Sequence, residues 1–149
     1  MTNYYFQAET IFQKPIEEIF HFFSKAENLE VITPPHLKFK IITPLPIEMK
    51  KGTLIEYQLK IYYIPVHWIT EITVWEPPHR FIDVQLKGPY RRWIHEHKFE
   101  KIENGTKMTD IVEYAVPGGI WAPVINHIFV KKDIQKIFSF RQQKCQELF

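Results

Sequence analysis

Between Leu37 and Val116 the chain alternates short runs of β-branched and aromatic residues with the turn-forming segments PLP, MKKG, YIP, EPPH, KGP and ENGT. This pattern predicts five or six antiparallel strands in succession. Asn104-Gly105 is the strongest turn signal, because this pair readily adopts the positive φ angles of a two-residue hairpin turn. Any fold for the chain must therefore contain a long antiparallel meander.

One further strand and a helix are predicted before this meander. Residues Tyr4–Phe12 are rich in aromatic and β-branched types and predict a strand. Pro15 begins an amphipathic helix whose apolar residues recur every three or four positions as far as Phe23. A short second helical turn is expected over residues 28–32, where the prolines that follow end it.

After residues 117–119 the apolar residues again recur with the period of a helix. The run predicts one helix of roughly 25 residues or more. Its apolar stripe comprises Trp121, Val124, Ile125, Ile128, Phe129, Ile134, Ile137, Phe138, Cys145 and Leu148. Because there is no repeat, low-complexity tract or linker, we predict a single α+β domain over residues 1–149.

Composition and charge exclude several classes of protein. Nineteen Lys and Arg against seventeen Asp and Glu leave a formal charge of +2, without a long charge run, so nucleic acid is not an expected partner. No stretch approaches the ~20 apolar residues of a membrane span, and no signal peptide is evident, so we expect a cytoplasmic protein without stable membrane insertion. The single cysteine, Cys145, fits a reducing compartment and is expected to be a buried apolar residue.

Strand periodicity gathers polar side chains among aromatic ones on one face of the predicted sheet. Trp93, His95 and His97 alternate along one strand and are expected to face the C-terminal helix. If residues 87–90 close the preceding hairpin, Asp83 lies opposite His95. The residues expected to face inward and to bind a ligand are Tyr57, Trp68, Thr70, Asp83, Gln85, Trp93, His95, His97, Asp110, Tyr114 and Arg141.

The expected cross-strand partners depend on where each turn lies. A turn centred on Asn104-Gly105 places Asp110 opposite Phe99. In the first hairpin of the meander, Tyr57 is expected opposite Thr70 on the same inward face.

Burying so many polar groups together requires partners for them. Each buried polar group costs about 1–3 kcal/mol unless it is hydrogen bonded, so these side chains must satisfy one another or be satisfied by water or a ligand. Aromatic walls with a few converging polar groups are the usual make-up of a small-molecule site. We therefore predict a ligand cavity between the sheet and the C-terminal helix. The alternative is a one-residue shift of strand register, which would turn Asp83 and Gln85 outward.

Alternative roles stay open for the ionisable residues. His95 and His97 could chelate zinc or non-haem iron with Asp83 or Asp110, but a hydrogen-bond network is the commoner arrangement, so no metal and no cofactor are expected. His95 oriented by Asp83 could act as a general base, which makes these two the catalytic candidates. Arg141 could bind a ligand carboxylate, or it could form a salt bridge to Asp83 or Asp110.

Three segments resemble the SRPBCC superfamily, which includes START lipid-transfer domains, polyketide cyclases and the major birch-pollen allergen: HWITEITVWEPPHRFIDVQLKGPYRRWIHEHKF (67–99), NLEVITPP (28–35) and GTKMTDIVEY (105–114). The resemblance covers essentially the whole chain. It is strongest to a bacterial ligand-binding branch whose members are sometimes called cyclase/dehydrases or cell division inhibitors. It implies a helix-grip fold, in which a curved seven-stranded antiparallel sheet wraps a long C-terminal helix and two short helices follow the first strand. Trp121 stands where a small residue is expected, so it should partly fill the cavity mouth.

Three functions are compatible with these features. The leading one is binding or carriage of a hydrophobic small molecule, such as a lipid, a polyketide-like compound or another aromatic metabolite. The second is a cyclase, dehydratase or hydrolase that uses His95 with Asp83, although a non-enzymatic role is favoured. The third is a protein-partner module such as a chaperone co-factor, which a solid interior and a large exposed apolar patch would favour. A homodimer is also left open.

Overall fold

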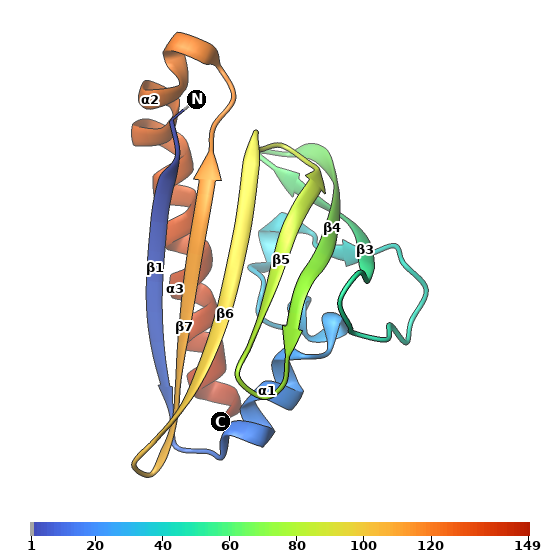
Figure 1. The fold of residues 1–149 in the computed structure, drawn as a ribbon. Coiled ribbons are helices and arrows are strands. Elements are labelled where there is room, and N and C mark those ends of the chain that lie inside the picture. The colour runs from blue at the N-terminus through green and yellow to red at the C-terminus, as the bar shows by residue number, and fades with distance from the viewer. Residues whose placement is uncertain (1) are drawn as a thin grey trace.

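A curved antiparallel sheet forms the larger part of the molecule (Figure 1). The computed structural model describes residues 2–149. Its strands are β1 (Tyr4–Phe12), β2 (Lys40–Ile41), β3 (Leu54–Ile61), β4 (Ile64–Glu76), β5 (Arg80–Lys87), β6 (Arg92–Ile102) and β7 (Gly105–Ala115). Their order is β1-β7-β6-β5-β4-β3-β2, so successive strands of the meander pair and β1 joins the edge beside β7. The predicted α+β helix-grip fold with seven strands is confirmed.

Short helices follow β1, and a long helix ends the chain (Figure 1). The helical elements are α1 (Ile16–Phe23), the 3-10 turns η1 (Ala26–Leu29), η2 (Pro35–Leu37) and η3 (Gly119–Trp121), α2 (Ala122–Ile125), the π-helical turn η4 (Asn126–Val130) and α3 (Lys131–Leu148). Pro15 occupies the N-cap position of α1. Glu17 and Glu18 lie in the first turn, where their negative charge interacts favourably with the positive end of the helix dipole. No helix within residues 2–149 is long and apolar enough to cross a bilayer.

The apolar stripe predicted for the C-terminal helix is only partly buried. Ile134 and Phe138 of α3 pack against β7, but Trp121, Ile128 and Phe129 are exposed. The π-helical turn η4 adds a residue to one turn and so rotates the stripe, and the segment from η3 to η4 extends past the ends of the strands (Figure 1). The expectation that Trp121 fills the cavity mouth is wrong, because Trp121 is 65% exposed and is not among the residues that line the cavity described below.

The β6–β7 hairpin turns one residue earlier than predicted. Ile102 pairs with Gly105, so the turn consists of Glu103 and Asn104, and Asn104 has a φ of 63°. Asp110 consequently lies opposite His97 rather than Phe99. Gly105 is the first residue of β7. A glycine is needed there because a Cβ would overlap the backbone carbonyl oxygen of Phe12.

The β3–β4 hairpin differs from its predicted register in the same way. Tyr62 and Tyr63 form a two-residue turn with φ angles of 50° and 68°, which side chains of this size rarely adopt. Tyr57 therefore pairs with Trp68 rather than with Thr70. Both register errors are shifts of two residues, so every side chain keeps its predicted face. The predicted pair of Asp83 with His95 is confirmed.

The core between the sheet and the helices is rich in aromatic contacts. Phe20 of α1 packs edge to face on Phe81 and Phe99, at centroid distances of 6.0 and 5.2 Å. Cys145 of α3 is fully buried in the same cluster, and burial raises the pKa of its thiol to about 11. It is the buried apolar residue that was predicted.

Replacing Gly105 with Ala should destabilise the fold by about 1–3 kcal/mol, because the added methyl group forces β1 and β7 apart. Urea denaturation measures this loss, with Lys101→Ala, an exposed change in the same hairpin, as the control. Equal free energies of unfolding for the two variants would contradict the assigned contact.

Candidate ligand cavity

A cavity of about 120 Å³ lies between the sheet and the helices. The predicted site residues on its wall are Tyr57, Trp68, Thr70, Asp83, Trp93, His95, His97 and Arg141. Other wall residues come from α1, η1 and the loop after it, and sequence reasoning missed them: Phe23, Ala26, Leu29, Thr33 and Phe39. These residues carried no distinctive signal, because Phe23, Ala26 and Leu29 read as ordinary helix packing and Thr33 and Phe39 as loop residues.

Aromatic side chains from adjacent strands form the apolar wall. Tyr57 of β3 stacks on Trp68 of β4, with centroids 5.7 Å apart and an interplanar angle of 18°. Trp93 of β6 meets Trp68 edge to face at 5.5 Å. Tyr90, which the sequence placed in a turn, packs against both tryptophans. Alternation along the strands brings these rings to one face.

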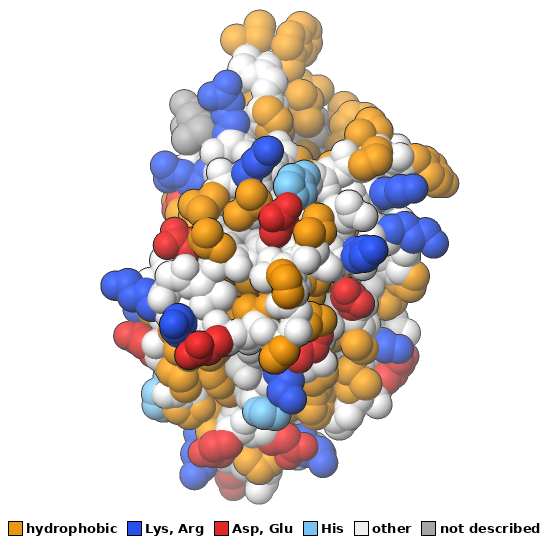
Figure 2. All heavy atoms as spheres, turned by 90° about the vertical axis from the view of Figure 1, so that its right-hand side faces the viewer, with side chains coloured by type: hydrophobic (Ala, Val, Ile, Leu, Met, Phe, Trp, Pro, Cys, Tyr) orange, Lys and Arg blue, Asp and Glu red, His pale blue; other side chains and the backbone are white. Residues whose placement is uncertain are grey.

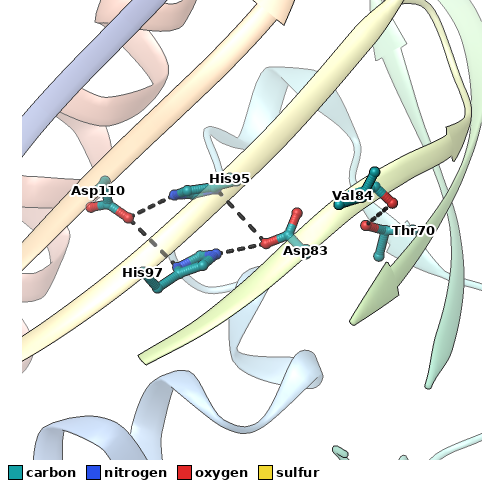
Figure 3. A network of polar contacts seen from close by, with 6 residues as sticks. All are labelled: Thr70, Asp83, Val84, His95, His97 and Asp110. Carbon is teal, nitrogen blue, oxygen red and sulfur yellow. Dashed lines mark hydrogen bonds and ion pairs between the residues drawn. The ribbon is translucent and has the colours of Figure 1, made fainter. Parts of the chain in front are cut away.

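Asp83, His95 and His97 form the polar wall, and Asp110 behind them completes an imidazole–carboxylate cluster (Figure 3). Neighbouring strands supply it: Asp83 lies on β5, the histidines on β6 and Asp110 on β7. Nε2 of His95 lies 2.8 Å from a carboxylate oxygen of Asp110, and Nε2 of His97 lies 2.6 Å from one of Asp83. The two imidazole rings stack at 3.7 Å. Each histidine thus has its own carboxylate.

The predicted catalytic pairing of His95 with Asp83 is not formed. Although the two residues are cross-strand partners, Nδ1 of His95 is 3.9 Å from Asp83, and its short contact is with Asp110. Cross-strand position fixes which backbones are opposite, but the two stacked rings tilt along the strand and reach diagonal neighbours. The arrangement of a base oriented by Asp83 belongs to His97 instead.

Burial and hydrogen bonding set the charges of the cluster. Burial opposes ionisation of Asp83 and Asp110, but their histidine hydrogen bonds and the nearby Arg141 outweigh it, so the pKa of each carboxyl lies below its usual value. Burial and the adjacent His95 lower the pKa of His97, against the opposing effect of Asp83. His97 is therefore neutral at pH 7, and since an ionised carboxylate only accepts, its Nε2–H donates to Asp83.

Three side chains on the cavity wall keep a buried polar atom without a hydrogen-bond partner. Within residues 2–149 five such atoms occur, and three of them are Trp68 Nε1, His97 Nδ1 and Arg141 Nε. The first and last are donors, and Nδ1 of neutral His97 is an acceptor. Leaving such a group unsatisfied costs about 1–3 kcal/mol. The wall residues Trp68 and Arg141 therefore carry unpaired donors, while the acceptor Nδ1 of His97 lies 3.6 Å from a carboxylate oxygen of Asp110 without a hydrogen bond.

Arg141 of α3 does not form the salt bridge that was one of its two predicted roles. Within residues 2–149 it makes no ion pair, and its guanidinium carbon lies 4.9 Å from the ring centroid of Phe138. Its charge still acts on the nearby carboxyls of Asp83 and Asp110.

A metal centre fits the cluster poorly. Asp83, His95 and His97 each offer a ligand atom within 4.8 Å of the others. However, a histidine lone pair lies in its ring plane, so rings stacked at 3.7 Å and 24° cannot both aim at one ion about 2.0–2.1 Å away. Both Nε2 atoms are also occupied by carboxylates. The geometry favours a hydrogen-bonded network.

Three predicted site residues do not line the cavity: Gln85, Asp110 and Tyr114. Gln85 bonds the backbone of Tyr90 and so braces the β5–β6 turn, while Asp110 lies behind the cluster as the partner of His95. Tyr114 donates to the side-chain oxygen of Asn126 at 2.8 Å. Thr70 does line the cavity, but its hydroxyl donates to the carbonyl of Val84 across the β4–β5 pair (Figure 3).

No protein-family model and no curated protein matches this chain in sequence. Solved structures do match in fold. Protein Ms6760 from Mycobacterium smegmatis aligns with a TM-score of 0.71 and 17% identity, over 97% of this chain and 89% of that one. Ginseng major latex-like protein 151 from Panax ginseng gives 0.70 and 9%, over 97% and 96%. Ara h 8.0201 gives 0.66 and 16%, over 95% and 97%.

These identities are low, so the comparisons establish the fold alone. The chain has the helix-grip fold of SRPBCC and birch-pollen-allergen-like proteins, as its sequence resemblance implied.

The cluster should make stability fall as the solution is acidified, in two pH windows. The folded pKa of His97 lies below its ordinary 6.5, so the unfolded chain takes up this proton first and stability is lost as pH falls below about 6.5. The folded pKa values of Asp83 and Asp110 lie below 3.8, so a second loss follows below about pH 4.

Thermal unfolding from pH 7.5 to 3 measures both windows. His97→Gln should reduce the loss of stability below about pH 6.5 and keep the loss below about pH 4. The exposed control His36→Gln should keep both losses. An unchanged upper slope in His97→Gln would show that this imidazole titrates alike in the folded and unfolded chain.

Proposed function

We propose that this protein binds a small molecule with an apolar body and a hydroxyl group in the cavity between the sheet and α3. The observation that carries the proposal is the set of three unpaired polar atoms on the cavity wall, on Trp68, His97 and Arg141. A guest that pairs with them recovers the cost of their burial, while the aromatic wall buries its apolar part.

Size limits the ligand to about one ring. The cavity measures about 120 Å³. It is slightly smaller than the apolar cavity of about 150 Å³ that binds benzene, and much smaller than the pockets of about 300–1,000 Å³ that hold drug-sized ligands. A complete lipid or polyketide would require the cavity to enlarge. Among the ligands suggested by the sequence, a single-ring aromatic metabolite fits best.

Charge favours a neutral hydroxyl over a carboxylate at the polar wall. The ionised carboxylates of Asp83 and Asp110 outnumber the single guanidinium of Arg141 at this wall. A ligand carboxylate would add another negative charge in a buried site. A hydroxyl both donates and accepts, so it can satisfy Nδ1 of His97 together with a donor from Trp68 or Arg141.

We also propose that the protein belongs to the bacterial ligand-binding branch that its sequence resembles. A cytoplasmic location is part of it too, since a free, buried Cys145 suits a reducing compartment.

Isothermal titration calorimetry with phenol, benzoate and toluene tests the proposal. Phenol should bind most tightly, because toluene leaves the polar atoms unpaired and benzoate adds charge. Trp68→Phe should weaken phenol binding about five-fold through loss of one hydrogen bond. Trp75→Phe is the matched control, because Trp75 packs in the core and does not line the cavity.

Two results would count against the proposal. One is equal binding of phenol and toluene, which would mean that the polar atoms play no part. The other is the absence of heat with every probe, together with no copurified molecule in native mass spectrometry.

Proton abstraction is a second candidate, favoured by one observation. His97 is neutral, is oriented by Asp83 and keeps Nδ1 unpaired, which is the arrangement of a general base. Exchange of the α-protons of cyclohexanone in D2O, followed by NMR, tests it. Catalysed exchange that His97→Gln abolishes would support this candidate, and no exchange above buffer would remove it.

A further inference from the structure

Two segments far apart in sequence expose large apolar side chains at one end of the molecule. We call this the apical patch and define it by Tyr63, Ile64, Ile120, Trp121, Val124 and Phe129. About half or more of each side chain is exposed, reaching 95% for Tyr63 and 88% for Ile120. Figure 1 shows the β3–β4 hairpin and α2 at the same end, and Figure 2 shows hydrophobic side chains gathered there.

Tyr62, beside the patch, holds its two segments together. The ring of Tyr62 meets that of Phe129 edge to face at 6.1 Å. The hydroxyl of Tyr62 also donates to the carboxylate of Asp133 at 2.9 Å. The hairpin tip and η4 therefore form one surface. The positive φ angles of Tyr62 and Tyr63 show that the chain keeps two aromatic residues at a tip where glycine or asparagine is preferred.

Exposed lysines border the patch. Residues 114–130 and 61–66 contain no Asp, Glu, Lys or Arg. Lys60 precedes the hairpin tip and Lys131 and Lys132 follow η4, and all three are exposed and form no ion pair within residues 2–149. The acid that follows them, Asp133, accepts the hydrogen bond of the Tyr62 hydroxyl, and the three lysines outnumber it at this border. The patch is thus uncharged and aromatic, with lysines at its border.

We infer that the apical patch docks on the surface of an anionic lipid bilayer. Helices that lie on membranes place Trp, Phe and aliphatic side chains about 5–10 Å into the boundary of headgroups and acyl chains, with lysines at the anionic headgroups. Each lysine near such a surface adds attraction that salt screens. Docking of this kind is peripheral and needs no membrane-spanning helix.

A second copy of the chain is a poorer occupant of the same surface. A two-fold dimer formed through the patch would bring together two copies of the same lysine-bordered surface. Like charges brought together in this way oppose association. An anionic surface instead complements them.

Cosedimentation with vesicles tests this inference without any cavity ligand. The full chain should bind vesicles of equal parts phosphatidylcholine and phosphatidylglycerol, and bind pure phosphatidylcholine far more weakly. Added salt should weaken the binding. Brominated lipids should quench fluorescence of the native protein but not of Trp121→Phe, because Trp121 is the exposed tryptophan of the patch.

Matched variants separate the patch from general effects of charge and surface polarity. Ile120→Ser with Trp121→Ser should weaken vesicle binding by about ten-fold or more. Ile11→Ser with Leu54→Ser, which removes two exposed apolar side chains outside the patch, should not. Lys131→Gln with Lys132→Gln should also lose about ten-fold, since each lysine contributes to attraction. Lys50→Gln with Lys51→Gln, of equal total charge, should not.

Melting curves establish that each variant is folded. Failure of the folded native protein to bind anionic vesicles overturns the inference, as does equal binding to neutral vesicles. A dimer in analytical ultracentrifugation that Ile120→Ser with Trp121→Ser dissociates, without vesicle binding, would assign the patch to a second copy.

Discussion

Two imidazoles, the buried carboxylate of Asp110 and the half-buried carboxylate of Asp83 lie between the sheet and α3, where an unpaired charge would cost several kcal/mol. The strands solve this by pairing each carboxylate with one histidine, so that Asp110 serves His95 and Asp83 serves His97. The pairing requires β5, β6 and β7 to keep their register, because a one-residue slip would carry these side chains to the opposite face. The hydrogen bonds of the cluster therefore depend on the register of β5, β6 and β7.

Both carboxylates of the cluster have hydrogen-bond partners, but some polar atoms of the cavity-lining residues do not. Trp68, His97 and Arg141 each retain a buried polar atom without a partner, in a protein whose other buried groups are mostly paired. Outside, the apical patch leaves apolar surface without a cover. The cavity thus keeps unpaired polar atoms, which suit a small hydroxylated ring. The apical patch keeps exposed apolar side chains, which suit an anionic lipid surface.

Strand periodicity predicted the antiparallel meander and much of the strand side of the cavity wall, while the family resemblance implied the helix-grip fold. Alternation along β6 placed Trp93, His95 and His97 on one face, and the two-residue register errors preserved that face. The hydrogen-bond partners could not be predicted, because they depend on ring tilt and on diagonal neighbours. The exposed position of Trp121 was also missed, since a π-helical turn leaves no mark on apolar spacing.

A crystal structure of protein purified directly from cells tests the central claim most directly. If the cavity is a ligand site, electron density of about one ring should lie against Trp68 and Trp93, with a polar atom within about 3.2 Å of Nδ1 of His97. A collapsed interior, in which Nδ1 of His97 and Nε1 of Trp68 bond to other protein atoms, would contradict the account.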